Sequence, residues 1–438
     1  MFMVKMMRIS YYSLGCKVNL YECEAIIQQF VKNGFELVNF HEIADVVLIN
    51  TCSITEVSDA KSRKIIRQAT RISPYAIVAV MGCYAQLNPE EIKKIPGVDL
   101  LIGTQYRHQV YDMVMELLKN RHFMMKIDEI SHLKIYEELK VLRYTNKTRG
   151  FVKIEDGCDN FCSYCTIPYA RGRVRSRQPH DVIDEIRTLS DEGMKEIVLT
   201  GINTGCYGRD LDHYSFVQLL NDLIEQVPSL GRLRISSIEL TEITDELLDL
   251  IKRYPNHFCM HLHIPLQGGI DSTLERMNRK YRIIDFEERL KNIRTLFPMI
   301  NITTDIMIGF NGESDEDFLE TCNNIFRLGF GEMHVFPYSR RPLTKAYHFP
   351  DIISEVVKKD RVKQMLAINQ MMGLAYRMQF KGKIVSLLVE KNDNGILFGH
   401  TSNYIEVEVK GNLSPNTEVD VVLTDPGYPI SKGVIHEF

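Results

Sequence analysis

Short apolar runs alternate with amphipathic stretches along the first third of the chain. Four runs have the length and apolar content of buried strands: residues 8–14, 45–50, 76–81 and 99–103. The stretches between them, such as residues 22–32 and 58–71, have the character of helices. Strands that alternate with helices build a parallel sheet from βαβ units. We therefore predict an α/β domain around a parallel sheet.

A second alternating block contains six strand-like runs: residues 151–155, 196–200, 233–238, 260–266, 300–308 and 332–336. Six units fall short of the eight that close a TIM barrel, so this block is predicted to form an open, partial (β/α)6 barrel. A long charged helix is expected to follow over residues 351–380. Residues 120–145 are polar and have no clear period, which predicts a linker between the two blocks.

The pattern changes after residue 380. Three short runs alternate apolar and polar residues, with turn residues between them: 384–389, 404–409 and 419–423. This spacing is typical of a small all-β barrel, a shape found among nucleic-acid-binding domains. The sequence thus predicts an α/β protein of three domains, at residues 1–142, 143–378 and 379–438.

Composition narrows the class of protein. The 438 residues are 45% hydrophobic and 25% charged, a balance that excludes a disordered chain and an extended coiled coil. The sequence has no apolar run of about 18 residues, so no membrane helix is expected. Residues 1–9 lack the apolar core of a signal peptide, and a cytoplasmic location is expected, where the ten cysteines would be thiols or metal ligands. With a net charge of −4, nucleic-acid binding would depend on local patches.

Three cysteines lie close together just after the first strand of the barrel block. Cys158, Cys162 and Cys165 form a C-x3-C-x2-C run. Three thiolates can bind three irons of a [4Fe–4S] cluster and leave the fourth iron open to a ligand, whereas ferredoxin runs supply a fourth cysteine. Zinc is the alternative, although it favours four closing ligands, usually in paired C-x2-C arms.

Three further cysteines follow predicted strands of the amino-terminal sheet. Cys16, Cys52 and Cys83 each stand two residues beyond a strand-like run. Because the carboxyl ends of parallel strands share one edge of a sheet, where ligands bind, we expect these thiols to converge. They would then form a second three-cysteine cluster site. The alternative is three unrelated buried cysteines, since free cysteine is among the most buried residue types.

The residues around both cysteine sets resemble those of one enzyme family. The C-x3-C-x2-C run at the end of a first barrel strand is similar to the cluster loop of radical S-adenosylmethionine (SAM) enzymes. Three further motifs resemble the amino-terminal domain of the methylthiotransferases: LGCKVN (residues 14–19), NTC (50–52) and GCYAQ (82–86). That family joins a cluster-binding α/β domain, a radical SAM barrel and a small β-barrel called TRAM, an order that matches the whole chain. The run CDNFCSYCTIPYARGRVRSR (158–177) looks most like the branch that acts on N6-threonylcarbamoyladenosine in tRNA.

The resemblance implies transfer of a methylthio group to C2 of N6-threonylcarbamoyladenosine (t6A) at position 37, beside the anticodon. It implies two [4Fe–4S] clusters and two molecules of SAM, with no catalytic side chain beyond the cluster ligands. The implied partners are a tRNA anticodon stem-loop and an unidentified electron donor and sulfur source. A monomer with no membrane partner is expected. Alternative substrates are N6-isopentenyladenosine in tRNA and an aspartate of a ribosomal protein, and a non-catalytic Fe–S RNA-binding protein is the alternative from another class.

Further cofactor contacts are implied on the barrel strands. Thr200 and Gly201 end the second strand and resemble the element that approaches the methionine part of SAM. Glu239 follows the third strand and is expected to accept from ribose hydroxyls, with a solvated loop carboxylate as the alternative. Gln267 follows the fourth strand at the barrel mouth. Four positions depart from the motifs of relatives: Gly268, Ile270, Asn311 and Leu343.

Four arginines recur at every second position after the cysteine run: Arg171, Arg173, Arg175 and Arg177. In an extended segment this period places all four guanidinium groups on one side. They are then expected to clamp the phosphates of an anticodon stem-loop, with a solvated, salt-bridged face as the alternative. Phe161 and Tyr169 nearby are candidates for stacking on a flipped base or for simple packing.

Overall fold

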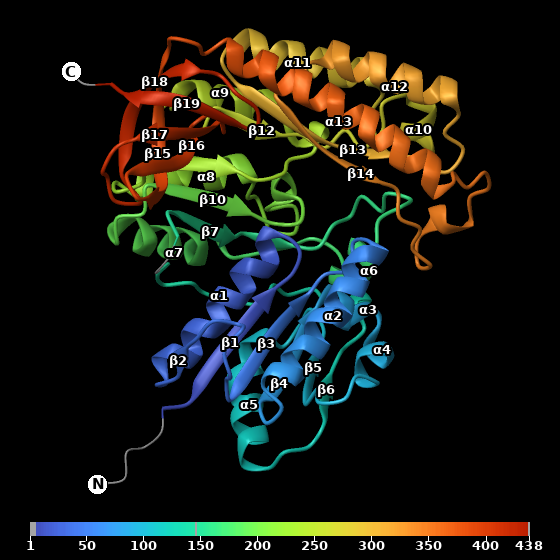
Figure 1. Cartoon of the computed structure of the whole chain (residues 1–438), viewed down its shortest axis with the longest axis vertical. Helices are drawn as coiled ribbons and strands as arrows, with labels where there is room; N and C mark the ends of the chain where they lie inside the picture. Colours follow the sequence, from blue (N-terminus) through green and yellow to red (C-terminus); the bar gives the residue numbers. More distant parts are fainter. Residues whose placement is uncertain (1–5, 145–146, 437–438) are drawn as a thin grey trace.

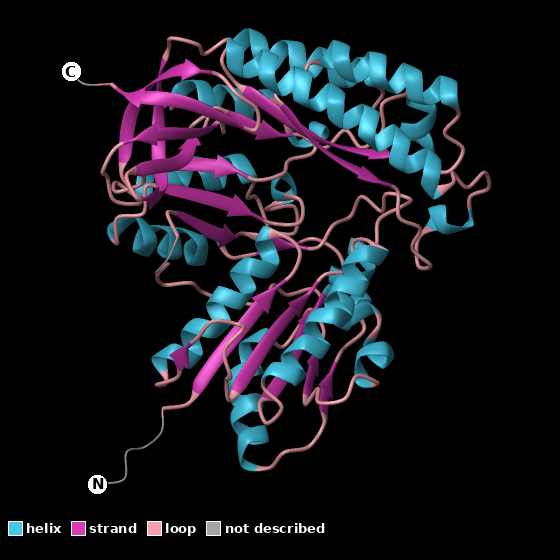
Figure 2. Cartoon of the chain, viewed as in Figure 1, coloured by secondary structure: helices cyan, strands magenta, loops and turns pink. Residues whose placement is uncertain are grey.

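Three regions follow one another along the chain in a computed structural model that describes residues 6–144 and 147–436 (Figure 1). Figure 2 shows an amino-terminal sheet covered by helices, a larger layer of strands and helices above it, and a small barrel of strands beside that layer. The mixed α/β class predicted from the sequence is confirmed. Part of the stretch examined for a signal peptide, residues 1–5, lies outside the described residues. No described helix is both long and apolar enough to cross a membrane.

The amino-terminal region is a parallel sheet in the order β2-β1-β3-β4-β5-β6. Its strands are β1 (Arg8–Ser13), β2 (Glu36–Leu37), β3 (Val46–Thr51), β4 (Ile77–Gly82), β5 (Leu100–Ile102) and β6 (Met124–Lys126). Its helices are α1 (Lys17–Lys32), α2 (Glu56–Ile72), α3 (Cys83–Leu87), α4 (Pro89–Lys93) and α5 (Val110–Lys119). Helices α1 and α5 cover one face, and α2, α3 and α4 cover the other. Every residue of β3 and β4 is buried, as expected for parallel strands covered on both faces.

The central region is the open, partial barrel that the sequence predicts. Its six strands are β7 (Arg149–Lys153), β10 (Glu196–Thr200), β11 (Arg232–Ile235), β12 (His261–His263), β13 (Asn301–Ile308) and β14 (Glu332–Pro337). They form two parallel sheets, β11-β10-β7 and β12-β13-β14, which parallel bridges join at Leu233–Phe258 and Ser237–His263. The helices around them are α7 (Pro179–Asp191), α8 (Phe216–Gln226), α9 (Asp245–Arg253), α10 (Asp271–Arg276), α11 (Ile283–Leu296), α12 (Asp315–Leu328) and α13 (Glu355–Met378).

The carboxy-terminal region is a closed barrel in the order β15-β16-β17-β19-β18. Its strands are β15 (Ile384–Asp393), β16 (Ile396–Thr401), β17 (Glu406–Lys410), β18 (Glu418–Asp425) and β19 (Ile430–Ile435). This barrel packs against the amino ends of the central strands. Arg234 Nη1 donates to the Ser402 carbonyl at 3.2 Å, and Asn301 Nδ2 donates to the Asn403 carbonyl at 2.9 Å. The opposite, carboxyl ends of the central strands stay free for the cysteine loop.

The linker predicted over residues 120–145 contains a strand, because β6 lies at Met124–Lys126 and pairs with β5; residue 145 lies outside the described residues. Leu139, Val141 and Tyr144 are buried in the same hydrophobic core as the central barrel. The acidic residues in this stretch are also engaged, because Glu137 accepts from Arg107 and Glu138 accepts from Arg177. The polar sequence without a hydrophobic period therefore corresponds to a largely irregular segment, which buried apolar side chains and ion pairs with arginines hold against the rest of the protein.

Candidate functional site

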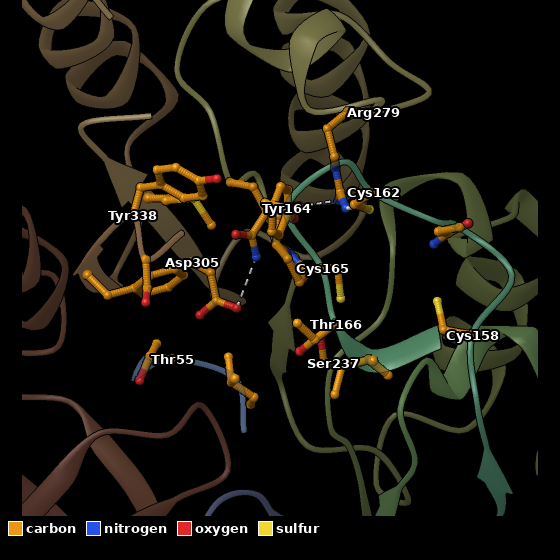
Figure 3. Close-up of a pocket in the computed structure, with 18 of the residues that line it drawn as sticks. Thr55, Cys158, Cys162, Tyr164, Cys165, Thr166, Ser237, Arg279, Asp305 and Tyr338 are labelled. Atoms are coloured by element: carbon orange, nitrogen blue, oxygen red, sulfur yellow. Dashed lines mark hydrogen bonds between the residues drawn. The ribbon is translucent and has the colours of Figure 1, made fainter. Parts of the chain in front are cut away.

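The three cysteines of the C-x3-C-x2-C run line one cavity of about 360 Å³ at the carboxyl ends of the central strands (Figure 3). We call it the loop cavity. The opposite wall is formed by β13 and β14, through Asp305 and Phe336. The amino-terminal region also contributes a wall through Ile54 and Thr55, which follow Cys52 closely.

The cysteine loop is held at its base by a short antiparallel pair, β8 (Glu155–Asp156) with β9 (Arg175–Ser176). Gly157 directly precedes Cys158 with φ +93°, and an added Cβ would lie 2.0 Å from the Arg173 carbonyl oxygen. Only glycine accommodates this close approach without strain. Helix α6 (Ile167–Arg171) then carries the chain away from the loop.

Two of the expected cofactor contacts, Glu239 and Gln267, line the loop cavity. Glu239 accepts from both terminal nitrogens of Arg279, which also donates to Cys162 Sγ at 3.4 Å. Gln267 has a left-handed backbone at φ +71° and its buried Oε1 has no hydrogen-bond partner among the described residues. Its Nε2 is 3.4 Å from Asp305 Oδ2. An orphaned buried acceptor in a cavity wall fits a polar ligand such as SAM.

Thr200 and Gly201 line a second cavity of about 440 Å³. We call it the inner cavity; its wall includes Cys16, His261 and Tyr404. It lies within the central barrel, and Ser237 lines both this cavity and the loop cavity. The structure therefore separates Thr200 and Gly201 from Glu239 and Gln267, and their predicted contact with SAM stays a prediction.

The second cysteine set gathers at the carboxyl edge of the amino-terminal sheet. Cys16 is exposed and lines the inner cavity, whereas Cys52 and Cys83 are buried. Burial is the main cause that raises the pKa of Cys83 to about 12, and the nearby thiols of Cys52 and Cys16 raise it further. Gly15 and Gly82 precede two of these cysteines and both have φ +101°. The three cysteines therefore lie at the same edge of the sheet, and their use as one cluster site stays a prediction.

The spacing of the thiols bears on which metal group they fit. No three His, Cys, Asp or Glu side chains within residues 6–144 and 147–436 lie close enough to share one ion. The ligands of a zinc ion surround a single centre, at about 2.3 Å from each sulfur. The cysteines of a [4Fe–4S] cluster bind different irons. That each cysteine set holds a cluster rather than zinc stays a prediction.

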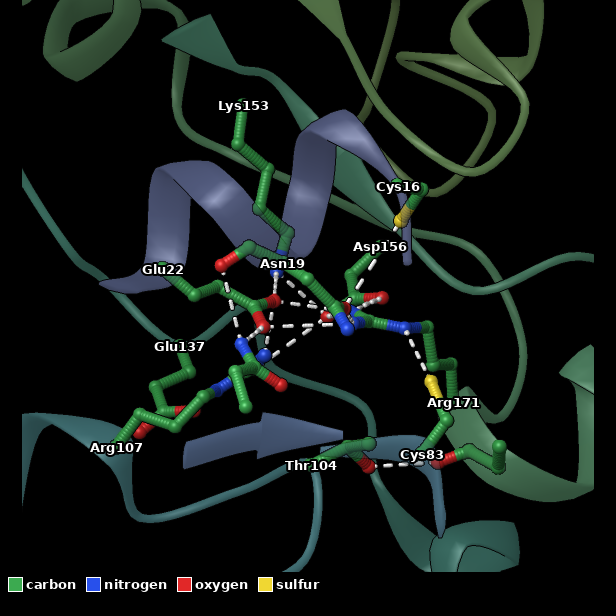
Figure 4. Close-up of polar contacts among 12 residues, drawn as sticks. Cys16, Asn19, Glu22, Cys83, Thr104, Arg107, Glu137, Lys153, Asp156 and Arg171 are labelled. Atoms are coloured by element: carbon green, nitrogen blue, oxygen red, sulfur yellow. Dashed lines mark hydrogen bonds and ion pairs between the residues drawn. The ribbon is translucent and has the colours of Figure 1, made fainter. Parts of the chain in front are cut away.

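A buried ionic network, which we call the seam network, joins the amino-terminal region to the barrel beside Cys16 and Cys83 (Figure 4). Its carboxylates are Glu22 of α1 and Asp156 of β8, and both accept from Arg171 and Lys153. Arg107 pairs with Glu22 as well. Burial alone would raise the carboxylate pKa values, but these cations hold the pKa of Glu22 and of Asp156 below the usual range.

Arg171 links the seam network to the second cysteine set. Its Nε donates to Cys83 Sγ at 3.3 Å, and its Nη2 donates to Asn19 Oδ1 at 2.7 Å. The Asn19 Oδ1 atom also lies 3.9 Å from Cys16 Sγ. Arg171 ends α6, the helix that follows the cysteine loop, so its contact with Cys83 links this helix to the second cysteine set.

The predicted arginine clamp is wrong for three of its four members. Arg171, Arg175 and Arg177 are at most 1% exposed and lie among carboxylates and carbonyls. The segment is not one extended strand, because α6 ends at Arg171 and Gly172 turns the chain at φ +76°. A two-residue period consequently does not put these side chains on one open face.

Arg173 is the exposed member of the run, with 70% of its side chain accessible. Its guanidinium lies over the ring of Phe161 at 5.4 Å, and Phe161 packs edge-on against Tyr169. Both aromatic rings are exposed as well. A cation and two exposed rings beside a cavity can contact nucleic acid through phosphate attraction and base stacking.

Sequence reasoning missed several side chains of the site. Arg279, which contacts both Cys162 and Glu239, lies more than a hundred residues after the cysteine loop, and no local pattern marks it. Lys17 lines the inner cavity, and its position directly after Cys16 was an available signal. Tyr404 enters that cavity from the carboxy-terminal barrel, a contact that only the tertiary structure reveals.

Comparisons with known proteins agree with these two halves of the site. Residues 8–103 match the model described as "Uncharacterized protein family UPF0004", and residues 152–325 match the Radical SAM superfamily. Among solved structures, the radical SAM methyltransferase TsrM from Kitasatospora setae superimposes with a TM-score of 0.57. That match covers 89% of this chain and 80% of TsrM at 14% identity, which supports the fold alone.

Relatives of known function align over nearly the whole chain. The threonylcarbamoyladenosine tRNA methylthiotransferase MtaB of Bacillus subtilis (strain 168) is 41% identical over 434 residues, covering 98% of this chain and 96% of that protein. The MtaB of Aquifex aeolicus is 36% identical over 405 residues, which cover 92% and 97%. A tRNA-2-methylthio-N(6)-dimethylallyladenosine synthase of Thermoanaerobacter pseudethanolicus is 35% identical over 410 residues, which cover 91% and 86%.

Proposed function

Since the chain belongs to the radical SAM methylthiotransferase family, we propose that it modifies tRNA by replacing the C2 hydrogen of t6A with a methylthio group. The choice of nucleoside rests on sequence identity to relatives whose names state their substrates. The MtaB relative of Bacillus subtilis, whose name gives threonylcarbamoyladenosine, is 41% identical, whereas the synthase of Thermoanaerobacter pseudethanolicus, named for dimethylallyladenosine, is 35% identical. We propose that the enzyme acts as a cytoplasmic monomer.

We assign one cluster to each cysteine set. Cys158, Cys162 and Cys165 would hold the radical SAM cluster in the loop cavity, and Cys16, Cys52 and Cys83 would hold an auxiliary cluster. When bound, the clusters and SAM supply the radical and the methylthio sulfur. An electron donor and a sulfur source are then required as partners. The two cavities meet at Ser237, which supports a shared substrate position between the two sets.

In this proposal, side chains of the protein bind and orient SAM and the tRNA. Gln267, with its unpartnered Oε1, and Glu239 would contact SAM in the loop cavity. Arg279 would position Glu239 while donating to Cys162. Three exposed side chains beside the loop cavity would contact the anticodon stem-loop: Arg173, Phe161 and Tyr169.

An anoxic assay tests the proposal. The reconstituted enzyme is incubated with SAM, sulfide, a reductant and anticodon stem-loops that carry either t6A or N6-isopentenyladenosine. Nucleosides are then identified by mass spectrometry. We expect 2-methylthio-t6A and release of 5′-deoxyadenosine. Formation of 2-methylthio-isopentenyladenosine alone would overturn the substrate, and the absence of 5′-deoxyadenosine would favour a non-catalytic Fe–S RNA-binding protein.

Two cysteine variants separate the roles of the clusters. Cys16→Ala is expected to release 5′-deoxyadenosine, because the radical SAM loop is intact. It should form no methylthio product, because the auxiliary cluster loses a ligand. Cys23→Ala is the matched control, since Cys23 lies on the same helix, α1, but is buried in the apolar core. It should retain both products. Full methylthiolation by Cys16→Ala would contradict the auxiliary cluster.

A further inference from the structure

The wall of the inner cavity contains buried polar groups that have no hydrogen-bond partner among the described residues and no role in the proposed function. Ser236 and His261 both line it and are less than 8% exposed. Ser236 Oγ and His261 Nδ1 have no hydrogen-bond partner among the described residues. His261 is held in place through Nε2, which lies 2.9 Å from Thr303 Oγ1. Two unpartnered buried polar atoms in one cavity wall indicate a polar ligand.

The same cavity has a cation without an ion-pair partner. Lys17 lines the cavity, and no ion pair or hydrogen bond within 4 Å joins it to another described residue. Burial is the main cause that lowers the pKa of its ammonium group to about 8, and the nearby Arg149 and Arg234 lower it further. Lys17 also begins α1, a helix of 16 residues whose N-cap, Cys16, makes no side-chain cap. The positive end of the helix dipole therefore adds to the lysine charge at this wall.

The carboxylates around the cavity are already paired. Glu196 accepts from Arg232 and from Arg234, which also lines the cavity. Glu332 on the cavity wall accepts from Arg377 at 3.2 Å.

Two further carboxylates near the cavity have their own partners. Asp305 lies within 4 Å of both His263 and His334. Glu390 pairs with Arg149 at 3.1 Å. Lys17 and the start of α1 are left to attract an anion from solution.

We propose that the inner cavity is the pocket for the threonylcarbamoyl group of the substrate, with Lys17 pairing the threonine carboxylate. This inference rests on the proposed function and deepens it. The t6A nucleoside carries a carboxylate and a hydroxyl on its N6 group, whereas the isopentenyl group is apolar. Ser236 and His261 offer hydrogen bonds to the polar group, and Lys17 with the α1 amino end offers a charge-assisted bond.

The position of the cavity agrees with this use. Cys16 of the auxiliary set lines the inner cavity, and Ser237 marks its junction with the loop cavity. A nucleobase at this junction would have its reacting carbon near both cysteine sets while its N6 group enters the inner cavity. Selection of t6A would then follow from desolvated polar groups that an apolar side chain leaves unpaired.

A coupled substitution in protein and RNA tests the proposal. Three stem-loops are compared: one with t6A, one with t6A whose carboxylate is converted to an amide, and one with N6-isopentenyladenosine. We expect the wild-type enzyme to lose about ten-fold in kcat/KM on the amide RNA, as one charge-assisted bond implies. Lys17→Gln should show the same loss on t6A RNA and no further loss on the amide RNA, because the two groups act as a pair.

Control variants isolate the charge. Lys17→Arg keeps the cation and should still distinguish t6A from its amide. Lys32→Gln, the same substitution at the other end of α1, should behave as wild type. Ser236→Ala should reduce kcat/KM on t6A RNA a few-fold. Iron content is measured for each variant, so that a loss of cluster is recognised.

The outcomes separate the two proposals. If the wild-type enzyme modifies t6A RNA but Lys17→Gln still distinguishes it from the amide RNA by about ten-fold, the inner-cavity proposal is overturned and the proposed function stands. If the wild-type enzyme modifies only isopentenyladenosine RNA, the proposed function fails first and this inference fails with it.

Discussion

At the scale of single residues, the seam network depends on full pairing of buried charges. Glu22 and Asp156 are at most 2% exposed, and each is stabilised by several cations that come from different parts of the chain. Removing one member of such a set leaves the others charged, buried and unpaired. The network is thus a sensitive point of the interface between the amino-terminal region and the barrel.

Arg171→Met is expected to lower the free energy of unfolding by about 3–5 kcal/mol, the cost of breaking a buried ion pair. Arg173→Gln is the matched control, because that side chain is exposed and its loss should change stability by less than about 0.5 kcal/mol. Urea unfolding of both variants checks the prediction. Equal stability of the two variants would contradict the structural role of Arg171.

Glu155 gives the protein a defined pH dependence. Its carboxyl is fully buried and Oε1 accepts from the Asn203 backbone N–H at 2.6 Å, but Oε2 has no partner among the described residues. Burial is the main cause that raises its pKa to about 8. The folded protein therefore keeps this proton in a range where the unfolded chain has lost it.

Stability from this proton is fully present below the unfolded pKa and is lost as the pH rises toward about 8. Between about pH 5.5 and 7.5 we expect a contribution that falls by about 1.4 kcal/mol per pH unit. Glu155→Gln should remove this slope, and Glu192→Gln, at an exposed position, should keep it. Denaturant midpoints at several pH values measure the difference. Parallel pH profiles for Glu155→Gln and the wild type would refute a protonated Glu155.

At the scale of elements, the end of β4 is shaped so that a cysteine can leave the sheet. Gly82 ends β4 at φ +101°, and an added Cβ would lie 2.2 Å from Asn50 Oδ1 and 2.6 Å from the Thr51 carbonyl. Such contacts force the backbone to move. Since Cys83 follows at once, a shift here displaces an auxiliary-cluster thiol.

Gly82→Ala is expected to reduce iron by about four atoms per chain while the radical SAM loop keeps its cluster. Gly34→Ala provides the control, because Gly34 also has a positive φ, of +89°, yet no atom lies within 4 Å of its added Cβ. It should lose stability without losing iron. Iron and sulfide analysis of the two variants measures the effect, and full iron in Gly82→Ala would show that the strand end tolerates a side chain.

The elements show what the sequence can and cannot predict. Strand-like runs identified the six central strands and the positions of both cysteine sets, because these follow from local periodicity and from the shared edge of parallel strands. The arginine run failed for a long-range reason. Glu22, which buries Arg171, lies 149 residues away, and no local pattern contains that pairing.

At the scale of the whole molecule, the three regions together line two neighbouring cavities that share Ser237. The amino-terminal region contributes Cys16 and Thr55 to the two cavities, and the carboxy-terminal barrel contributes Tyr404. The Tyr404 ring stacks on His261 at 4.7 Å and lies 4.8 Å from the Arg234 guanidinium, which closes the amino end of the barrel. The carboxy-terminal barrel is therefore part of the inner cavity as well as a candidate RNA-binding module.

Iron content tests most directly the claim that both cysteine sets hold clusters beside these joined cavities. The wild-type chain, reconstituted without oxygen, is expected to bind about eight irons and eight sulfides. The variant with Cys16, Cys52 and Cys83 all changed to alanine should bind about four of each and still cleave SAM. About four irons in the wild-type protein, or an unchanged count in the triple variant, would contradict the account.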